Sequence, residues 1–184
     1  MKLKHIILLL LVILAVGAFL WVRSISSQEV QAPDMMRAAH EEVYAGLFNY
    51  GHVGGETGKM VQKVHTLIRP HLNKEEEYIL PQLGLLRHLI DDKVEDPKLM
   101  AEMIGYSEKL YDDLPMLRAE HQALRQAVEQ LIQVADQEGQ IEVATYAKHL
   151  LQHIQDEDDV FYPAAVLVGK YLDLKRSIAS QSRN

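Results

Sequence analysis

The sequence contains no cysteine among its 184 residues. This absence excludes disulfide bonds, thiolate zinc sites, iron–sulfur clusters and cysteine nucleophiles. Low-complexity tracts are also absent, proline and glycine are sparse (6 and 10 residues), and 48% of the residues are hydrophobic. The chain can therefore build a buried core, and any metal that it holds must be bound through nitrogen and oxygen.

Basic residues are the minority among the charged ones. The chain has 19 Lys and Arg against 26 Asp and Glu, a formal net charge of -7. Lys2, Lys4 and Arg23 lie in the first 23 residues, which hold no acid, so the remainder is more acidic still. An acidic body without a basic stripe argues against nucleic-acid binding.

Only one long uncharged run is present, from Ile6 to Val22 (IILLLLVILAVGAFLWV). Its length is at the short end for a transmembrane helix, and the basic residues before it favour a cytoplasmic N-terminus. We expect residues 1–23 to be a membrane anchor, residues 24–33 a polar tether, and residues 34–184 a domain in the periplasm or at the cell exterior. The alternative is a cleaved signal peptide and a secreted form, because Val16-Gly17-Ala18 has small residues at a spacing suited to processing.

The remainder shows helical periodicity and no strand-like alternation of useful length. The pattern predicts core helices over about 34–50, 57–89, 115–138 and 141–160, a weaker helical piece over 98–113, and a last helix over 164–178. Pro70 and Pro81 predict bends in the second helix, or its end near Pro81, and the third core helix is expected to follow Pro115. The predicted fold is all-α: an antiparallel four-helix bundle with a short C-terminal helical extension.

Two stretches are copies of one motif. The first runs from His71 to Pro81 (HLNKEEEYILP) and the second from His153 to Pro163 (HIQDEDDVFYP). In each, Glu follows four residues after the His, two more acids come next, and Pro ends the motif. Four residues make about one helical turn, so each His and its Glu project from the same face. Two such pairs, brought together by folding, would provide the ligands of a metal site.

The repeat extends upstream of both motifs. The stretch MMRAAH, which ends at His40, aligns with MLRAEH, which ends at His121. Each of these histidines lies on the apolar face of a predicted helix, at a matched distance before its motif. The chain therefore consists of two duplicated helical hairpins, which we expect to pair about a pseudo-two-fold axis.

We predict a metal site of four His and two Glu: His40, His71, Glu75, His121, His153 and Glu157. A single His-x-x-x-Glu pair is more often a solvated helix face, and a His in an apolar stripe is usually a satisfied core residue. Four such histidines beside two inward carboxylates would be costly to bury without a cation. Nitrogen and carboxylate ligands suit iron, manganese or zinc, and two bridging carboxylates suit a pair of ions.

Neighbouring polar residues are expected to have lesser roles. His149 is expected at the rim or in packing, with an extra ligand as the alternative. The acids that trail the two motifs are expected to form a solvated face: Glu76, Glu77, Asp158 and Asp159. Asp158 is the reserve carboxylate if the fourth helix rotates. Tyr44 and Tyr78 can approach the centre, although aromatics at helical spacing are more often core residues.

These motifs closely resemble those of the hemerythrin-like family, the HHE cation-binding domains, over about residues 34–165. The resemblance implies a four-helix bundle with a non-haem di-iron centre, in which Glu75 and Glu157 bridge the irons and the four histidines complete the protein ligands. The oxygen-carrying hemerythrins have a second His on helix three, one turn from the first, where this chain has Leu117 and Arg125. One iron is therefore expected to be more open, which favours peroxide, nitric oxide or sensing chemistry over reversible oxygen carriage.

The leading functional hypothesis is a di-iron protein outside the cytoplasm that binds or senses oxygen or a related small oxidant, with manganese or zinc as alternative metals. The second is a di-iron peroxidase or oxidase, or an iron-delivery or repair factor in oxidative or nitrosative stress. The third is a plain bundle for protein contact. A ferritin-type bundle is disfavoured because its signature is Glu-x-x-His, at a different spacing and in the reverse order.

Overall fold

The computed structural model describes residues 30–181. The predicted anchor, residues 1–23, and most of the predicted tether lie outside the described residues. All described helices belong to one unit of the chain, which begins at Gln31. This part contains helices and turns and no β-strand, which confirms the all-α prediction.

The first hairpin begins with α2 (Asp34–Tyr50) and α3 (Gly55–Lys74), joined by a short turn. In this turn the N–H of Val53 donates to the carbonyl of Tyr50. The turn packs tightly against the start of α3, because a Cβ added at Gly58 would lie 1.8 Å from the carbonyl oxygen of Val53. Glycine at this position is therefore required by the close approach of the two backbones.

The second predicted helix does not end near Pro81. Helix α3 passes through Pro70 and continues into a π-helical turn, η1 (Glu75–Ile79), followed by α4 (Leu80–Gly84) and α5 (Leu86–Ile90). The irregularity thus lies in the turn before Pro81, and it takes the form of a wider helical turn.

Helix α6 runs without a break from Pro97 to Gln137, and Pro115 lies inside it. The predicted division into a piece over 98–113 and a third helix that starts after Pro115 is therefore wrong. A proline inside a helix loses one N–H bond and crowds the carbonyl four residues earlier. Packing offsets this cost, because α6 buries apolar residues on both sides of the proline, including Leu110 and Leu117 at 0% exposure.

The last part of the chain is also one helical rod: α7 (Ile141–Asp156), a second π-helical turn, η2 (Glu157–Phe161), and α8 (Tyr162–Gln181). Gly139, with a φ of 70°, forms the reversal between α6 and α7. This left-handed conformation favours glycine and ends α6, as the sequence predicts. Helix α8 is the predicted C-terminal extension, continuous with α7 through η2.

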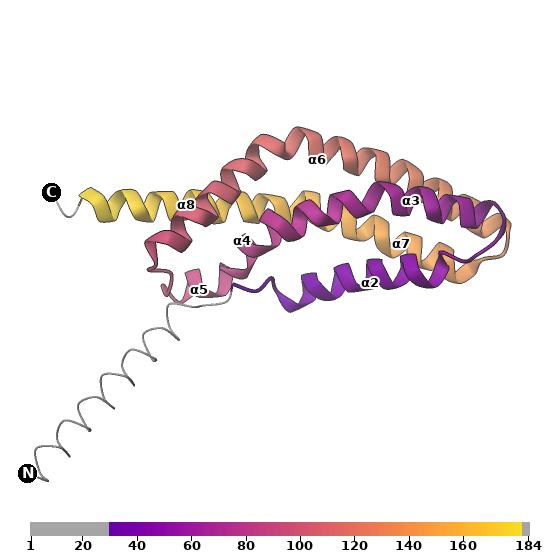
Figure 1. The fold of residues 1–184 in the computed structure, drawn as a ribbon, viewed down its shortest axis with the longest axis horizontal. Helices are drawn as coiled ribbons and strands as arrows, with labels where there is room; N and C mark the ends of the chain where they lie inside the picture. Colours follow the sequence, from indigo (N-terminus) through magenta and orange to yellow (C-terminus); the bar gives the residue numbers. More distant parts are fainter. Residues whose placement is uncertain (1–29, 182–184) are drawn as a thin grey trace, which may run out of the picture. The chain divides into compact units, whose positions relative to one another are not determined.

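The helices form a four-helix bundle, as the sequence predicts (Figure 1). Helix α6 packs against α3, α7 and α8, and α2 closes the bundle by packing against α3 and α7. Short connections between consecutive helices give an antiparallel order. In Figure 1, α8 runs from α7 toward the end of the domain that holds α4, α5 and the start of α6.

The core consists of two apolar clusters separated by a polar layer. One cluster includes Val43, Leu72, Leu124 and Ile154, and the other includes Met36 and Tyr78 with residues of α6 and α8. Each of the four helical rods passes from one cluster to the other. At that crossing each rod carries a buried polar side chain: His40, Glu75, His121 and Glu157. Ionisable side chains from all four rods therefore form a single polar layer across the hydrophobic core.

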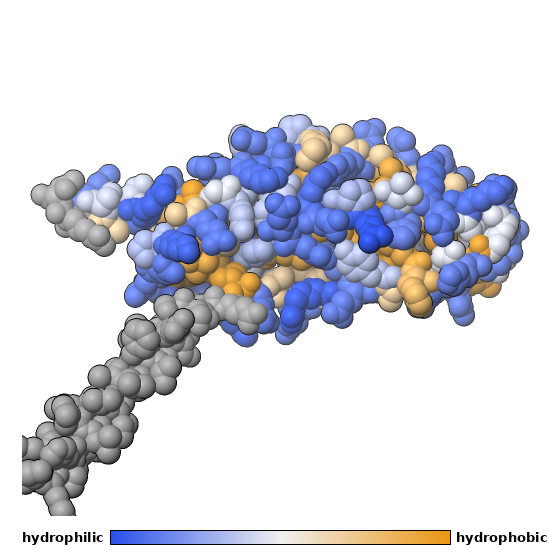
Figure 2. Space-filling view, viewed as in Figure 1, coloured by the Kyte–Doolittle hydropathy of each residue, from blue (hydrophilic) through white to orange (hydrophobic). Residues whose placement is uncertain are grey.

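No helix within residues 30–181 is both long and apolar enough to cross a membrane. The face of the domain shown in Figure 2 is largely hydrophilic, with apolar side chains exposed at intervals. This surface agrees with the acidic composition of the chain.

Candidate metal centre

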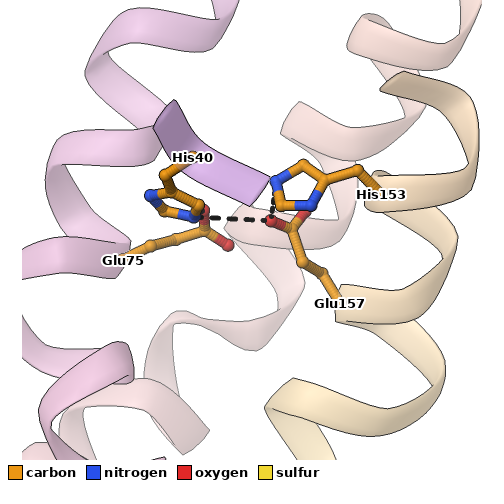
Figure 3. Close-up of side chains that lie close together, drawn as sticks. All are labelled: His40, Glu75, His153 and Glu157. Carbon is orange, nitrogen blue, oxygen red and sulfur yellow. Dashed lines mark ion pairs between the residues drawn. The ribbon is translucent and has the colours of Figure 1, made fainter. Parts of the chain in front are cut away.

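The first group of the polar layer contains His40, His153, Glu75 and Glu157 (Figure 3). His40 projects from α2 and His153 from the last turn of α7, so each hairpin provides one imidazole. His40 Nε2 lies 3.3 Å from Glu75 Oε2 and 4.0 Å from Glu157 Oε1. His153 Nε2 lies 2.8 Å from Glu157 Oε1. Four potential ligand atoms thus surround one point.

The second group contains His71, His121 and the same two glutamates. His71 comes from α3 and His121 from α6, so this group also takes one imidazole from each hairpin. The two Nε2 atoms lie 2.8 Å apart. His71 Nε2 is 3.5 Å from Glu75 Oε1, and His121 Nε2 is 3.3 Å from Glu157 Oε2.

Glu75 and Glu157 each divide their two oxygens between the groups. Glu75 faces His40 with Oε2 and His71 with Oε1. Glu157 faces His153 with Oε1 and His121 with Oε2. Both carboxylates are almost fully buried. This is the arrangement in which a carboxylate bridges a pair of metal ions.

Both glutamates begin a π-helical turn, and in each motif a proline follows six residues after the glutamate. In an α-helix the ring of Pro81 or Pro163 would crowd the carbonyl four residues before it. The chain widens instead: the N–H of Leu80 donates to the carbonyl of Glu75, and the N–H of Tyr162 donates to that of Glu157. These bonds span five residues and define a π-turn, which is frequent at functional sites. The repeated motif therefore gives both bridging candidates the same local backbone.

Acidic side chains contact three histidines through Nδ1, the outer nitrogen of each ring. His121 Nδ1 lies 2.9 Å from Asp158 Oδ1, and His71 Nδ1 lies 3.0 Å from Glu120 Oε2. His40 Nδ1 makes a longer contact, 3.4 Å, with Glu76 Oε1. When a carboxylate accepts the Nδ1 proton, the lone pair of Nε2 points into the centre, as in the carboxylate–histidine pairs of metal sites.

Glu76 is exposed, as expected for the solvated acidic face, whereas Asp158 departs from that expectation because its side chain is only 20% exposed. Asp158 is not in the ligand set of either group, because it bonds His121 and the guanidinium of Arg125. Glu120 was not identified from the sequence. It corresponds to Ala39 in the other half of the repeat, and this difference was the one signal that could have marked it.

Tyr162 is the other polar residue at the centre that sequence reasoning missed. Its hydroxyl donates to Glu75 Oε1 at 2.6 Å and lies 3.3 Å from His71 Nε2 and 3.2 Å from His121 Nε2. The first motif has Leu80 at the matching position, so the repeat itself is broken here. Burial and the nearby glutamates raise the pKa of Tyr162, so its hydroxyl stays protonated in the protein alone.

The remaining candidates lie away from the two groups. His149 is 66% exposed and pairs with Glu42 at the surface. The Tyr78 hydroxyl donates to Asp113. The Tyr44 hydroxyl reaches Glu76, the acid that contacts the outer nitrogen of His40.

The carboxylates and imidazoles strongly perturb one another. Burial lowers the pKa of His71, but Glu75 and the other acids outweigh it and raise that pKa to about 9. The pKa of His40 is also raised, for the same reasons. Burial by itself would raise the pKa of Glu75, but His40 and His71 hold it well below its usual range. A positive charge next to Glu75 is therefore strongly stabilised in the centre.

Several of these polar atoms have no hydrogen-bond partner, which tests whether the residues fit a metal. Glu75 Oε2, Glu157 Oε1 and His153 Nε2 are buried, and none of them makes a hydrogen bond. His153 Nε2 and Glu157 Oε1 are close but poorly aligned for a hydrogen bond. All three atoms belong to the first group. Unpaired buried acceptors that face one point fit a cation, which would satisfy them together.

These features define a class: all-helical bundles whose core contains His and Glu clusters able to hold metal. The family model of the hemerythrin HHE cation binding domain matches residues 31–165. The chain therefore belongs to this family, which confirms the resemblance stated from the motifs. No curated protein and no solved structure gives a significant match to the chain.

Proposed function

We propose that this protein binds two iron ions in the polar layer and uses them to bind or sense oxygen or a related small oxidant. The observation that carries the proposal is the division of oxygens: Glu75 and Glu157 each present one oxygen to each histidine group. His40 and His153 would hold one ion, and His71 and His121 the other. Manganese or zinc would suit the same donor atoms.

The chain supplies a dry and oriented site for such ions. The apolar clusters on both sides of the layer exclude water, which strengthens the interaction of the carboxylates with a cation. Asp158 and Glu120 fix His121 and His71 through their outer nitrogens. Iron bound here would supply redox chemistry and open coordination positions for a small ligand.

The residues around His121 favour sensing or oxidant chemistry over simple oxygen carriage. One turn before His121 lies Leu117, which is buried and apolar, and one turn after it lies Arg125, which pairs with Asp158. Neither supplies the second histidine that oxygen-carrying hemerythrins have on this helix. A di-iron peroxidase or oxidase is therefore the alternative proposal.

An optical experiment tests the proposal and separates it from the alternative. We expect the iron-loaded full-length protein to show a visible charge-transfer band that appears with oxygen and disappears when oxygen is removed. Rapid bleaching with consumption of peroxide would instead support the enzyme. Iron-loaded protein whose spectrum responds to neither oxidant would contradict both.

We also propose that residues 1–23 tether the domain to a membrane with residues 34–184 outside the cytoplasm. The support is the uncharged run and its preceding lysines. Reporter fusions at the C-terminus test this proposal: activity of a periplasmic reporter is expected, and activity of a cytoplasmic reporter alone would contradict it.

A further inference from the structure

We infer that Tyr162 is an oxygen ligand of the metal ion held by His71 and His121. This inference rests on the proposed two-metal centre and adds a fifth protein donor to one of its ions. The sequence gives no precedent for it within the chain, because the matching residue of the first motif is Leu80.

The distances around the hydroxyl oxygen carry the inference. Metal–nitrogen and metal–oxygen bonds are about 2.0–2.2 Å long, so neighbouring ligands at right angles lie about 3 Å from each other. Tyr162 Oη is 2.6 Å from Glu75 Oε1, 3.2 Å from His121 Nε2 and 3.3 Å from His71 Nε2. It therefore has the spacing of a further ligand relative to three of the four donor residues of this group.

The backbone and the ring of Tyr162 are held in place by the surrounding structure. Tyr162 follows the end of η2, and its N–H donates to the carbonyl of Glu157, the first residue of η2. Its ring stacks on that of His121, with the planes 19° apart. A tyrosine that only filled the core could point its hydroxyl elsewhere, whereas here the hydroxyl is the part that enters the donor group.

Tyr162 also separates the second group from solvent. It lines a surface cavity of about 330 Å³ together with Leu114, Arg118 and Asp158, yet it is only 2% exposed. The ring forms a wall between this cavity and the centre. A change to phenylalanine keeps the wall and removes only the oxygen.

Coordination would require one proton to leave. The Oη–H bond, which now points to Glu75, breaks as the iron–oxygen bond forms, and the proton passes to the buffer. No electron is transferred, so ferric iron added to the protein suffices. The second ion would then have five protein donors and the first four, which leaves the His40 and His153 ion the more open to a small ligand.

The test compares ferric-loaded full-length wild type with Tyr162→Phe and Tyr44→Phe. Tyr44 is the matched control, because its hydroxyl donates to Glu76 and to no member of either group. We expect a visible phenolate-to-iron charge-transfer band in wild type and Tyr44→Phe, and its loss in Tyr162→Phe with iron content retained. Survival of the band in Tyr162→Phe, or its loss in Tyr44→Phe, would overturn the inference.

A measurement on the wild type alone covers the case in which Tyr162→Phe does not fold. Resonance Raman excitation into the band is expected to enhance tyrosine ring vibrations. Iron-loaded wild type without these vibrations overturns the role of Tyr162 and leaves the two-iron proposal intact. Failure of the wild type to bind iron at all would instead remove the proposed function on which the inference rests.

Discussion

At the scale of single residues, His71 and His121 are held by acids that lie outside the two groups. Asp158 accepts from His121 Nδ1 and also from Arg125, so its carboxylate fixes both the ring orientation and its own position. Glu120 does the same for His71 and pairs with Lys74. The histidines are thereby presented with Nε2 toward the glutamates.

Replacement of Asp158 by Asn is expected to weaken metal binding by roughly 10–100-fold, because loss of such an outer partner typically has this effect. Competition with a chelator of known affinity measures the change. Asp159→Asn is the matched control: Asp159 is the adjacent acid of the same turn, is exposed, and accepts a hydrogen bond from Gln155 rather than from a histidine. Equal affinities of the two variants would contradict the orienting role of Asp158.

The six residues of the two groups could be predicted from the sequence because the motif occurs twice with an upstream histidine in each half. Tyr162 and Glu120 could not, because each occurs in only one half of the repeat. A comparison of the two halves of the repeat identifies only the residues that both halves share. Their roles depend on contacts between residues 49 and 87 positions apart, which only the fold brings together.

At the scale of helices, α2 docks on α7 through a close contact at Gly46. A Cβ at this position would lie 2.0 Å from the ring of Tyr146, whose hydroxyl donates to the carbonyl of Val43. Helix α2 carries His40, so this contact also sets the distance of His40 from the rest of the first group.

Gly46→Ala is expected to destabilise the protein by about 1–3 kcal/mol, since the added methyl group must displace a packed aromatic ring. Gly105→Ala is the control, for which we expect a change in the free energy of unfolding of opposite sign. Gly105 lies in α6 with no atom within 4 Å of an added Cβ. Alanine there is expected to stabilise by roughly 0.5–1 kcal/mol, because glycine is unfavourable in a helix interior. Urea unfolding measures the change in the free energy of unfolding for both variants. Destabilisation of equal size in both would contradict the close packing of Gly46 against Tyr146.

The sequence predicted which segments are helical better than where they are interrupted. Pro115 was expected to precede a new helix, but packing on both sides of it holds α6 together. Pro81 was expected to bend or end a helix; the helix does not end there, and the turn that begins at Glu75 is a π-turn. Propensity gives the local cost of a proline, whereas tertiary contacts decide how the chain accommodates it.

At the scale of the whole molecule, the bundle contains a layer of charge between two apolar clusters. The bundle itself could be predicted from helical periodicity and short connections. The way α8 packs along the first half of α6 could not, because no repeat or motif marks that contact. The layer places Glu75 and Glu157 in the interior, each with one oxygen that accepts no hydrogen bond, which is unfavourable in the protein alone.

Metal loading is therefore expected to stabilise the whole fold. A ligand that binds only the native state at a concentration 1,000-fold above its Kd adds about 4 kcal/mol. For a protein of this size, that corresponds to a rise in Tm of roughly 10 °C. Thermal unfolding with and without iron measures it, and a chelator should reverse it. A Tm that does not respond to iron would argue against a metal in this layer.

We propose that two ions share Glu75 and Glu157, and the iron-to-protein ratio of the purified full-length chain tests this sharing. We expect two irons per chain in the wild type, matching the two groups that share the glutamates. We expect fewer than two in the double variant Glu75→Gln, Glu157→Gln. A wild-type ratio of one or less, measured after loading with excess ferrous iron and removal of the unbound metal, would contradict a centre of two ions.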